Sequence, residues 1–209
     1  PAGVVLFISG DGGWHLGVVG MAKHMVEEGM IVVGIDVRTY RTAINAPGDQ
    51  CRYYAADFEE LSHAVQQRLK LDEYHVPVLA GYSSGATLAY AVMIQSPPGT
   101  WAGVMSLGFC PDLDLVRKPC RGYGLEYTLQ GTEAKPKGLV YRPSSSNRTH
   151  WIVLQGETDQ VCDPAGTRSF VAATGRSELV SLPKVGHGFG VERNWLPQFR
   201  QAQLTLAAG

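Results

Sequence analysis

The stretch from Val76 to Met93 constrains this chain most, because it joins an apolar run, a glycine-flanked serine and a helical segment without interruption. Val78-Leu79-Ala80 predicts a buried strand, and the small and aliphatic residues after Gly85 predict a helix. Between them, Gly81-Tyr82-Ser83-Ser84-Gly85 matches G-x-S-x-G, the pattern of a sharp strand-to-helix turn that exposes a nucleophilic serine. The glycines are expected because a Cβ at either place would press on the neighbouring strand or helix. The alternative is a tight turn between strand and helix that carries no chemistry.

The rest of the chain alternates apolar runs with helical segments, which is typical of a parallel sheet covered by helices. Besides the strand before Ser83, buried strands are predicted at Gly3–Ile8, Ile31–Asp36, Trp101–Leu107, Trp151–Leu154 and Leu179–Leu182. Helices are predicted at His15–Glu28, Tyr53–Leu69, Pro164–Ala173, directly after Ser83 and from about Asn194 onward. The short connections imply right-handed parallel crossovers. We therefore expect an α/β fold with about six mainly parallel strands and helices on both faces.

Two segments interrupt this rhythm. Val37–Gln50 is polar and is predicted to be irregular. The stretch from about 110 to 149 is rich in Pro, Gly and polar residues, and we predict a small insertion after the fourth strand. Within it, Tyr123–Leu129 and Gly138–Arg142 predict a hairpin over the C-terminal edge of the sheet, where ligands bind in such folds. Because no linker splits the chain, residues 1–209 are predicted to form one domain that includes this insertion.

Composition excludes several classes of function. Among the 209 residues, 44% are hydrophobic and 18% are charged, as in an ordinary globular domain. A net charge of −1 argues against a nucleic-acid binder or a polybasic membrane binder. No apolar run approaches the roughly 18 to 20 residues that a transmembrane helix needs. The chain starts at Pro1 and enters a strand almost at once, so we expect a processed or trimmed segment without its signal peptide.

The cysteines bear on the compartment. Cys51, Cys110, Cys120 and Cys162 show no C-x-x-C spacing, so neither a zinc site nor a thioredoxin motif is indicated. We predict two disulfides and hence an oxidising compartment, with all three pairings open. The alternative is four free thiols in a cytosolic enzyme. We predict no metal and no cofactor.

Two further residues complete a catalytic constellation with Ser83. A serine needs a base within hydrogen-bond reach, and His187 lies between two glycines in the loop after the last strand. Asp159 follows the strand Trp151–Leu154 and is the preferred acid, whereas Asp163 precedes a proline and is expected to cap the next helix. The chain order Ser…Asp…His is typical of α/β-hydrolases. The alternative for His187 is an ordinary surface-loop histidine.

The loop after the first strand, Ser9-Gly10-Asp11-Gly12-Gly13-Trp14, is expected to complete the site. We predict an oxyanion hole formed by the backbone N–H of Ser84, at a helix N-terminus, and that of Asp11 or Gly12. The side chains of Asp11, Trp14 and Tyr82 are predicted to contact the substrate. The Asp11 carboxylate either meets a cationic substrate group or braces its own loop through backbone hydrogen bonds.

The sequence resembles the VirJ (AcvB-type) bacterial virulence protein family over most of its length. The resemblance lies in the glycine loop Ser9–Trp14, in Gly81–Gly85, in Gly156-Glu157-Thr158-Asp159-Gln160-Val161-Cys162 and in Leu182-Pro183-Lys184-Val185-Gly186-His187. The glycine loop is the distinctive piece, since generic hydrolases usually carry a histidine before that glycine. The resemblance places Ser83, Asp159 and His187 at the positions of the catalytic triad.

This resemblance implies an α/β-hydrolase domain exported to the periplasm, sometimes beside a second VirJ-like domain in a longer protein. It implies a link to virulence and type IV secretion, and a serine hydrolase that cleaves aminoacyl esters of phosphatidylglycerol. Two other functions are alternatives: a generic carboxylesterase or thioesterase, and a non-catalytic binding module of the same fold that serves secretion.

Overall fold

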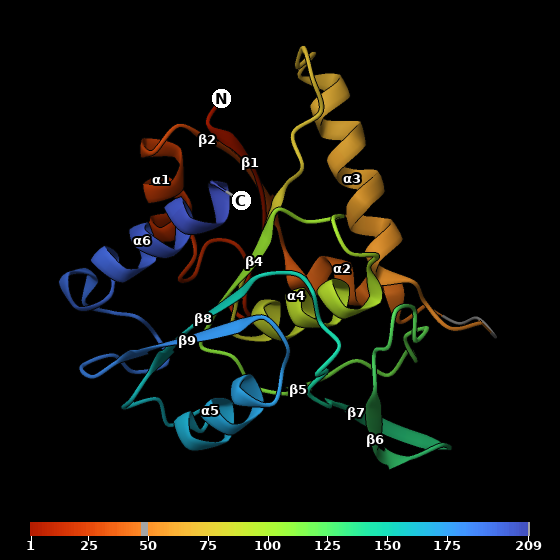
Figure 1. Cartoon of the computed structure of the whole chain (residues 1–209). Helices are drawn as coiled ribbons and strands as arrows, with labels where there is room; N and C mark the ends of the chain where they lie inside the picture. The colour runs from red at the N-terminus through yellow and green to blue at the C-terminus, as the bar shows by residue number, and fades with distance from the viewer. Residues whose placement is uncertain (47–49, 209) are drawn as a thin grey trace.

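A six-stranded parallel sheet forms the centre of the protein (Figure 1). The computed structural model describes residues 1–46 and 50–208. The strands are β1 (Gly3–Ile8), β2 (Met30–Ile35), β3 (Val78–Tyr82), β4 (Gly103–Leu107), β8 (Trp151–Gly156) and β9 (Ser177–Leu182). They are ordered β2-β1-β3-β4-β8-β9, and each neighbouring pair is parallel. The predicted α/β fold with about six mainly parallel strands is confirmed.

The strand order places a switch point between β1 and β3. From β1 the chain first adds β2 on one side, and it later adds β3 on the other side. The loops that leave the C-terminal ends of β1 and β3 therefore diverge, and a crevice forms at that edge of the sheet. Ser83 follows β3, and the glycine loop Ser9–Trp14 follows β1, so both lie at this crevice.

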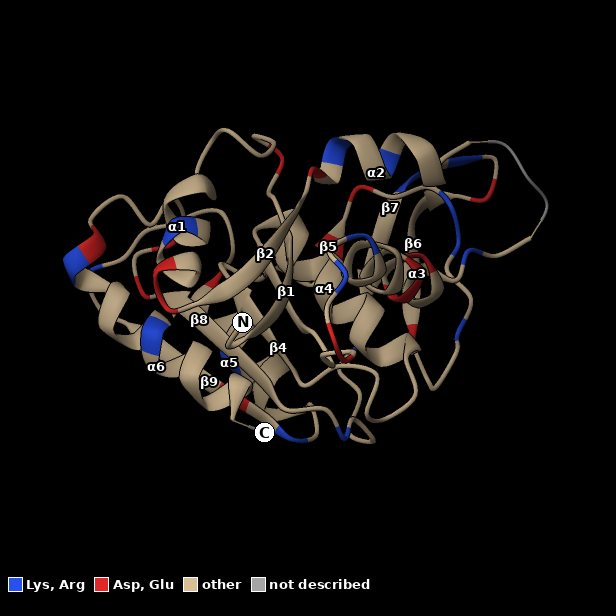
Figure 2. Ribbon diagram, turned by 90° about the horizontal axis from the view of Figure 1, so that it is seen from above, with Lys and Arg blue, Asp and Glu red and all other residues tan. Residues whose placement is uncertain are grey.

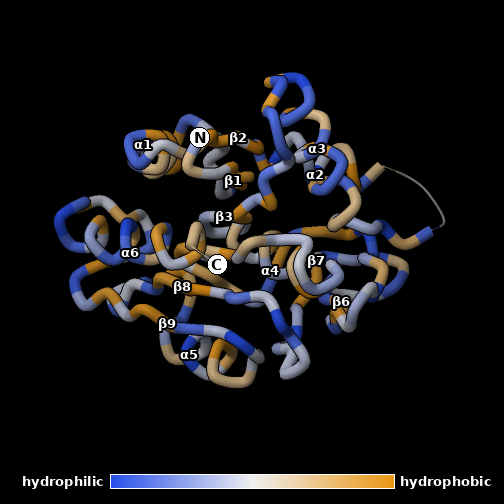
Figure 3. Tube along the Cα trace, turned by 45° about the horizontal axis from the view of Figure 1, so that its top comes forward, coloured by the Kyte–Doolittle hydropathy of each residue, from blue (hydrophilic) through white to orange (hydrophobic). Residues whose placement is uncertain are grey.

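Helices cover both faces of the sheet, as predicted. On one face, α1 (Val19–Glu27) and α6 (Leu196–Ala207) share a group of buried apolar side chains with the strands. On the other face lie α3 (Tyr54–Arg68), α4 (Ser84–Gln95) and α5 (Pro164–Ala172). Helix α4 is buried along nearly its whole length, and Figure 3 shows it among the hydrophobic segments of the interior. A single turn of 3-10 helix, Glu192–Asn194, precedes α6.

The prediction of an irregular segment at Val37–Gln50 was wrong over its first part. Helix α2 spans Val37–Ile44; residues 47–49 lie outside the described part of the chain. The Asp36 carboxylate caps this helix by accepting the N–H groups of Arg38 and Thr39. Val37 and Ile44 are buried, seven residues apart on one helix face. The cap and two apolar positions suffice, although the segment is otherwise polar.

The helix predicted from His15 begins later, at Val19. The residues before it form turns, and Gly13 and Gly17 adopt positive φ angles of 75° and 100°. These conformations are incompatible with a right-handed helix, which explains the later start. The glycine loop is therefore longer than the sequence pattern suggested.

The insertion contains a small antiparallel sheet of β5 (Asp112–Leu113), β6 (Tyr127–Thr132) and β7 (Lys135–Tyr141). The predicted hairpin is present with shifted bounds, but its expected place over the strand ends needs correction. The insertion runs along α4: the Tyr90 hydroxyl donates to the carbonyl of Arg142, and the Gln95 amide donates to that of Cys120. Its buried leucines join the core beside α4, so packing against that helix decides its position.

Two disulfides are present, as predicted, and the structure selects one of the three pairings. Cys51–Cys120 joins the segment before α3 to the insertion, and Cys110–Cys162 joins the loop after β4 to the loop after β8. None of the helices in the described residues is long and apolar enough to span a bilayer.

Candidate active site

Ser83 occupies a strained turn between β3 and α4. Its φ is 55° and its ψ is −122°, a region that residues with a Cβ rarely adopt. The flanking glycines are required sterically. A Cβ on Gly81 would lie 2.1 Å from the carbonyl oxygen of Gly85, and a Cβ on Gly85 would lie 2.4 Å from the carbonyl oxygens of Ile8 and Ser9. The elbow expected from G-x-S-x-G is therefore present.

A continuous chain of hydrogen bonds links Ser83 to His187 and Asp159. The Ser83 Oγ lies 2.9 Å from His187 Nε2, and His187 Nδ1 lies 2.8 Å from Asp159 Oδ2. The Asp159 side chain is fully buried, and that of His187 is 18% exposed. Asp163 instead accepts the N–H groups of Ala165 and Gly166 at the start of α5. The structure thus brings together the three predicted triad residues and places Asp163 at a helix cap.

The Asp159 carboxylate is held by more donors than the histidine alone. Its Oδ1 accepts the backbone N–H groups of Val161 and Cys162, at 2.8 and 2.9 Å. Its Oδ2 also accepts a hydrogen bond from the buried Gln155 side chain, at 3.0 Å. Sequence reasoning missed Gln155. The signal was a single amide at the end of the otherwise apolar run of β8.

Tyr82 lies under the histidine loop. Its hydroxyl donates to the carbonyl of His187 at 2.9 Å, and its ring packs against those of His187 and Phe189. Burial raises the pKa of Tyr82, with the Asp159 charge acting in the same direction, so the hydroxyl stays protonated and can donate. The substrate contact predicted for Tyr82 remains a prediction; the structure shows a contact to the base.

Trp14 lies away from this group of contacts. Its ring packs edge-on against Phe7 of β1 and covers Gly34 of β2. It lines a largely apolar cavity beside α1 of about 370 Å³, together with Val19, Ala22, Lys23, Val26, Glu27 and Val32. Within the described residues, no hydrogen bond or ring contact joins Trp14 to the triad. The substrate contact predicted for Trp14 remains a prediction.

A hydrogen bond to Asp36 connects the glycine loop to the start of α2. The Asp36 carboxylate accepts the Trp14 N–H at 3.1 Å and pairs with the Arg38 guanidinium, which holds the pKa of Asp36 at about 2. Gly13 has a φ of 75°, a left-handed conformation that favours glycine, and the Arg38 guanidinium lies directly beside it. Figure 2 shows the two basic positions of α2, with an acidic position at the start of the helix. Sequence reasoning did not find this role of Asp36.

Asp11 does not brace its own loop, and its predicted contact with a cationic substrate group remains a prediction. Its carboxylate is 65% exposed and pairs with Arg41 of α2, with Oδ1 and Nη1 3.1 Å apart. The backbone hydrogen bonds expected of a loop-bracing carboxylate are not formed among the described residues. The partner lies 30 residues away, on a helix that was not predicted.

The predicted oxyanion donors lie near the serine. Gly10 adjoins Ser83, since a Cβ on Gly10 would lie 3.1 Å from the Ser83 Cβ. The next two residues of that loop are Asp11 and Gly12, and Ser84 opens α4. In the described part of the chain, the N–H groups of Asp11, Gly12 and Ser84 make no hydrogen bond to protein acceptors. They can therefore serve a ligand.

The side-chain atoms of Asp159, Cys162 and His187 lie within 4.8 Å of one another. Such a group can suggest a metal site. Here the Cys162 sulfur belongs to a disulfide and cannot act as a thiolate ligand. The carboxylate and the imidazole are already hydrogen-bonded to each other.

A strained serine elbow at the switch point of a parallel sheet, with a histidine after the last strand, defines an α/β-hydrolase fold. Residues 2–109 match the family described as bacterial virulence protein (VirJ), which is just over half of the chain. The chain belongs to this family. The matched region includes Ser83, whereas Asp159 and His187 lie beyond it. None of the curated proteins compared with this chain matches its sequence.

Solved structures share the fold at low sequence identity. The chain is similar to the esterase domain of a Rhodothermus marinus protein, with 14% identity, a TM-score of 0.63 and coverage of 100% of this chain and 88% of that chain. It is also similar to dienelactone hydrolase from Anabaena variabilis, with 17% identity, a TM-score of 0.63 and coverage of 97% of this chain and 84% of that chain. A serine hydrolase without a lid from Xanthomonas campestris has 19% identity, a TM-score of 0.55 and coverage of 98% of this chain and 81% of that chain. At this identity the likeness supports the fold.

Proposed function

We propose that this protein is a serine ester hydrolase that works through an acyl-enzyme. The observation that carries the proposal is the continuous hydrogen-bond chain Ser83–His187–Asp159, with heavy-atom distances of 2.9 and 2.8 Å. These distances are within the range in which a base can take the serine proton. Ser83 is the nucleophile, His187 the general base and acid, and Asp159 the group that orients the imidazole.

In this mechanism Ser83 Oγ attacks the ester carbonyl while its proton passes to His187 Nε2. The tetrahedral intermediate collapses, and the alcohol leaves with the proton from His187. A water molecule then gives a proton to His187 and attacks the acyl-Ser83 carbonyl. The second tetrahedral intermediate collapses, Ser83 Oγ takes the proton back from His187, and the acid is released. The buried Asp159 accepts the Nδ1–H throughout and stabilises the imidazolium.

The developing oxyanion is assigned to the N–H of Ser84 and the N–H of Asp11 or Gly12. Among the described residues these donors make no hydrogen bond to a protein acceptor, and Ser84 stands at the N-terminus of a 12-residue helix. Preorganised N–H groups stabilise the transition state without having to reorient during the reaction. The exposed Asp11 carboxylate is our proposed contact for a cationic group of the substrate.

For the substrate we propose aminoacyl esters of phosphatidylglycerol, with attack by Ser83 giving an aminoacyl-enzyme. This choice rests on membership of the VirJ family, from which we also infer the link to virulence. We further propose that residues 1–209 act as one domain, that a second VirJ-like domain can accompany it, and that the protein works in the periplasm. The two disulfides support an oxidising compartment.

The experiment is hydrolysis of lysyl- and alanyl-phosphatidylglycerol by the pure protein beside its Ser83→Ala variant, with fluorophosphonate labelling of both. We expect labelling and amino-acid release by the wild type only. Release of acid from plain acyl esters, with no release from the aminoacyl lipids, would identify a generic esterase. Absence of labelling and of turnover on every ester would reject the enzyme and favour a binding module.

A further inference from the structure

The Asp159 carboxylate depends on its loop for its position. Two of its four hydrogen bonds come from backbone N–H groups of that same loop, those of Val161 and Cys162. The side chain is fully buried, so water cannot replace a lost donor easily. A displacement of the loop would therefore carry Asp159, and with it the His187 imidazole.

Gln155 ties this loop to the segment that follows β4. Its Oε1 accepts the N–H of Phe109 at 3.1 Å. Its Nε2 donates to Asp159 Oδ2 at 3.0 Å and to the carbonyl of Cys162 at 3.2 Å. The side chain is 2% exposed. The Gln155 amide thus connects Phe109 of the segment after β4 to both Asp159 and Cys162 of the loop after β8.

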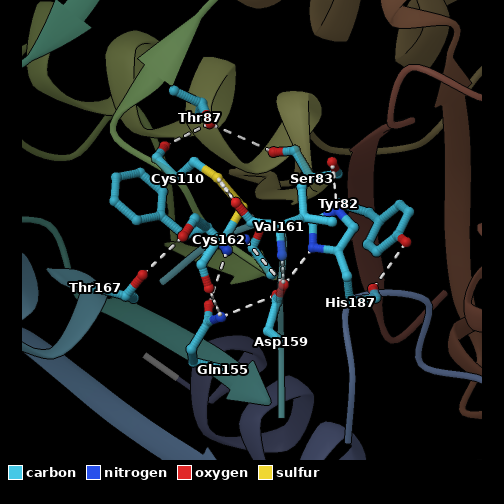
Figure 4. Close-up of a disulfide and its surroundings, with 12 residues drawn as sticks. Tyr82, Ser83, Thr87, Cys110, Gln155, Asp159, Val161, Cys162, Thr167 and His187 are labelled. Carbon is cyan, nitrogen blue, oxygen red and sulfur yellow. Dashed lines mark hydrogen bonds and ion pairs between the residues drawn. A yellow bond between two sulfur atoms is a disulfide. The ribbon is translucent and has the colours of Figure 1, made fainter. Parts of the chain in front are cut away.

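The Cys110–Cys162 disulfide makes the same connection covalently (Figure 4). Cys162 donates its N–H to the triad acid, at 2.9 Å from Asp159 Oδ1. The carbonyl of Cys110 accepts the hydroxyl of Thr87 at 2.7 Å. Thr87 lies on α4, one turn after Ser83. A short path of bonds therefore runs from the helix of the nucleophile, through the disulfide, to the acid.

The same segment also adjoins the base. Gly108 has a φ of 61°, and a Cβ there would lie 3.4 Å from His187 Nδ1. The carbonyl of Phe109 accepts the hydroxyl of Thr167 on α5 at 2.8 Å. Residues 108–110 are thus hydrogen-bonded to α4 and α5 and lie next to the imidazole. These contacts fix their position relative to the triad.

From these contacts we infer that Gln155 and the Cys110–Cys162 disulfide are positioning elements of the catalytic site, which hold Asp159 in register with His187 and Ser83. The inference rests on the proposed hydrolase function. It also makes full activity dependent on oxidation of this one cysteine pair. Loss of alignment by about 1 Å can lower a rate by about 100-fold, whereas the substrate-binding surface is left in place.

The second disulfide supplies a matched control. Cys51–Cys120 joins residues 69 apart in the sequence, and Cys110–Cys162 joins residues 52 apart, so the two close loops of similar length. Around Cys51–Cys120, backbone hydrogen bonds join Arg52 to Lys118 and Cys120. The side chain of Gln95, at the end of α4 remote from Ser83, donates to the carbonyls of Arg52 and Cys120. In the described residues, none of these bonds reaches the triad.

The test compares the double variants Cys110→Ser/Cys162→Ser and Cys51→Ser/Cys120→Ser with the wild type. For the first we expect kcat to fall by about 10-fold to 100-fold, with KM within about threefold. For the second we expect kcat within about twofold, although both variants should melt earlier. The low-field proton NMR signal of the His187 Nδ1–H should weaken or shift in the first variant only. Equal kcat values and an unchanged signal in both variants would overturn the inference.

A third variant keeps the test decisive if the first does not fold. Gln155→Leu keeps the approximate volume and removes the amide, and we expect the same loss of kcat with a retained KM. An unchanged kcat and an unchanged His187 signal in a folded Gln155→Leu variant would reject the positioning role. If the wild type hydrolyses no ester, the proposed function fails, but the NMR comparison still tests the alignment of Asp159 and His187.

Discussion

The hydroxyl of Tyr82 donates a hydrogen bond to the backbone carbonyl of His187 across 2.9 Å. The residue before the nucleophile thereby holds the loop of the base, 105 positions further along the chain. The relationship links the geometry of the elbow directly to the alignment of the imidazole. It gives Tyr82 a role that depends on its hydroxyl as well as on its ring.

We predict that Tyr82→Phe lowers kcat several-fold and reduces the free energy of unfolding by about 1 kcal/mol. The ring contacts remain, so only the hydrogen bond to the histidine loop is lost. Tyr90→Phe is the matched control, because the Tyr90 hydroxyl also donates to a carbonyl, that of Arg142. Steady-state kinetics and urea unfolding of both variants provide the measurement. A kcat loss of the same size in Tyr90→Phe would show that the effect is unrelated to His187.

Ser83→Ala and His187→Ala should each lower ester turnover by several orders of magnitude while the fold is retained. Because these residues act as a unit, the double variant should be hardly worse than either single one. Turnover measured beside circular dichroism spectra tests this expectation. Full activity in Ser83→Ala would end the assignment of the nucleophile.

Asp159→Asn should lower kcat by about 10⁴-fold, since a neutral amide cannot hold the imidazole tautomer that the mechanism needs. Asp163→Asn should leave kcat nearly unchanged, because asparagine also caps helices well. The two carboxylates lie four residues apart, and only Asp159 contacts His187. Kinetics in the reverse order would identify Asp163 as the functional acid.

Asp11→Asn should raise KM for aminoacyl esters and spare uncharged acetyl esters. The reason is the loss of an exposed negative charge beside the predicted oxyanion donors. Arg41→Gln offers the opposite change, since it removes the cation that already pairs with Asp11, and KM for aminoacyl esters should fall. Equal effects of Asp11→Asn on both ester types would point to damage of the glycine loop and would contradict recognition of the amine.

The Asp36–Arg38 pair should make stability depend on acid pH. The folded-state pKa of Asp36 is about 2, below the ordinary value of 3.8. The group therefore stabilises the fold fully above about pH 4, and this contribution is lost as the pH falls toward 2. Asp36→Asn should lower the melting temperature more at pH 7 than near pH 2.5. Parallel melting-temperature curves for wild type and variant across this range would exclude the carboxylate as the cause.

The sequence alone determined the features that depend on the local backbone. The apolar runs predicted the parallel strands, because a strand that is buried on both faces consists almost entirely of apolar residues. The glycines around Ser83 predicted the elbow, since no other residue fits where a Cβ would meet a carbonyl at 2.1 Å. Chain order then selected Ser83, Asp159 and His187, because successive parallel strands end at one edge of the sheet.

Only the tertiary structure decided which distant side chains meet. The pairing of Asp11 with Arg41 depends on α2, which forms because Asp36 caps it and Val37 and Ile44 face the core. The role of Gln155 and the pairing of Cys110 with Cys162 depend on β4 lying beside β8, although the insertion separates them in sequence. The spacing of residues along the chain does not predict such contacts. They arise from strand order and packing, which bring together groups that are remote along the chain.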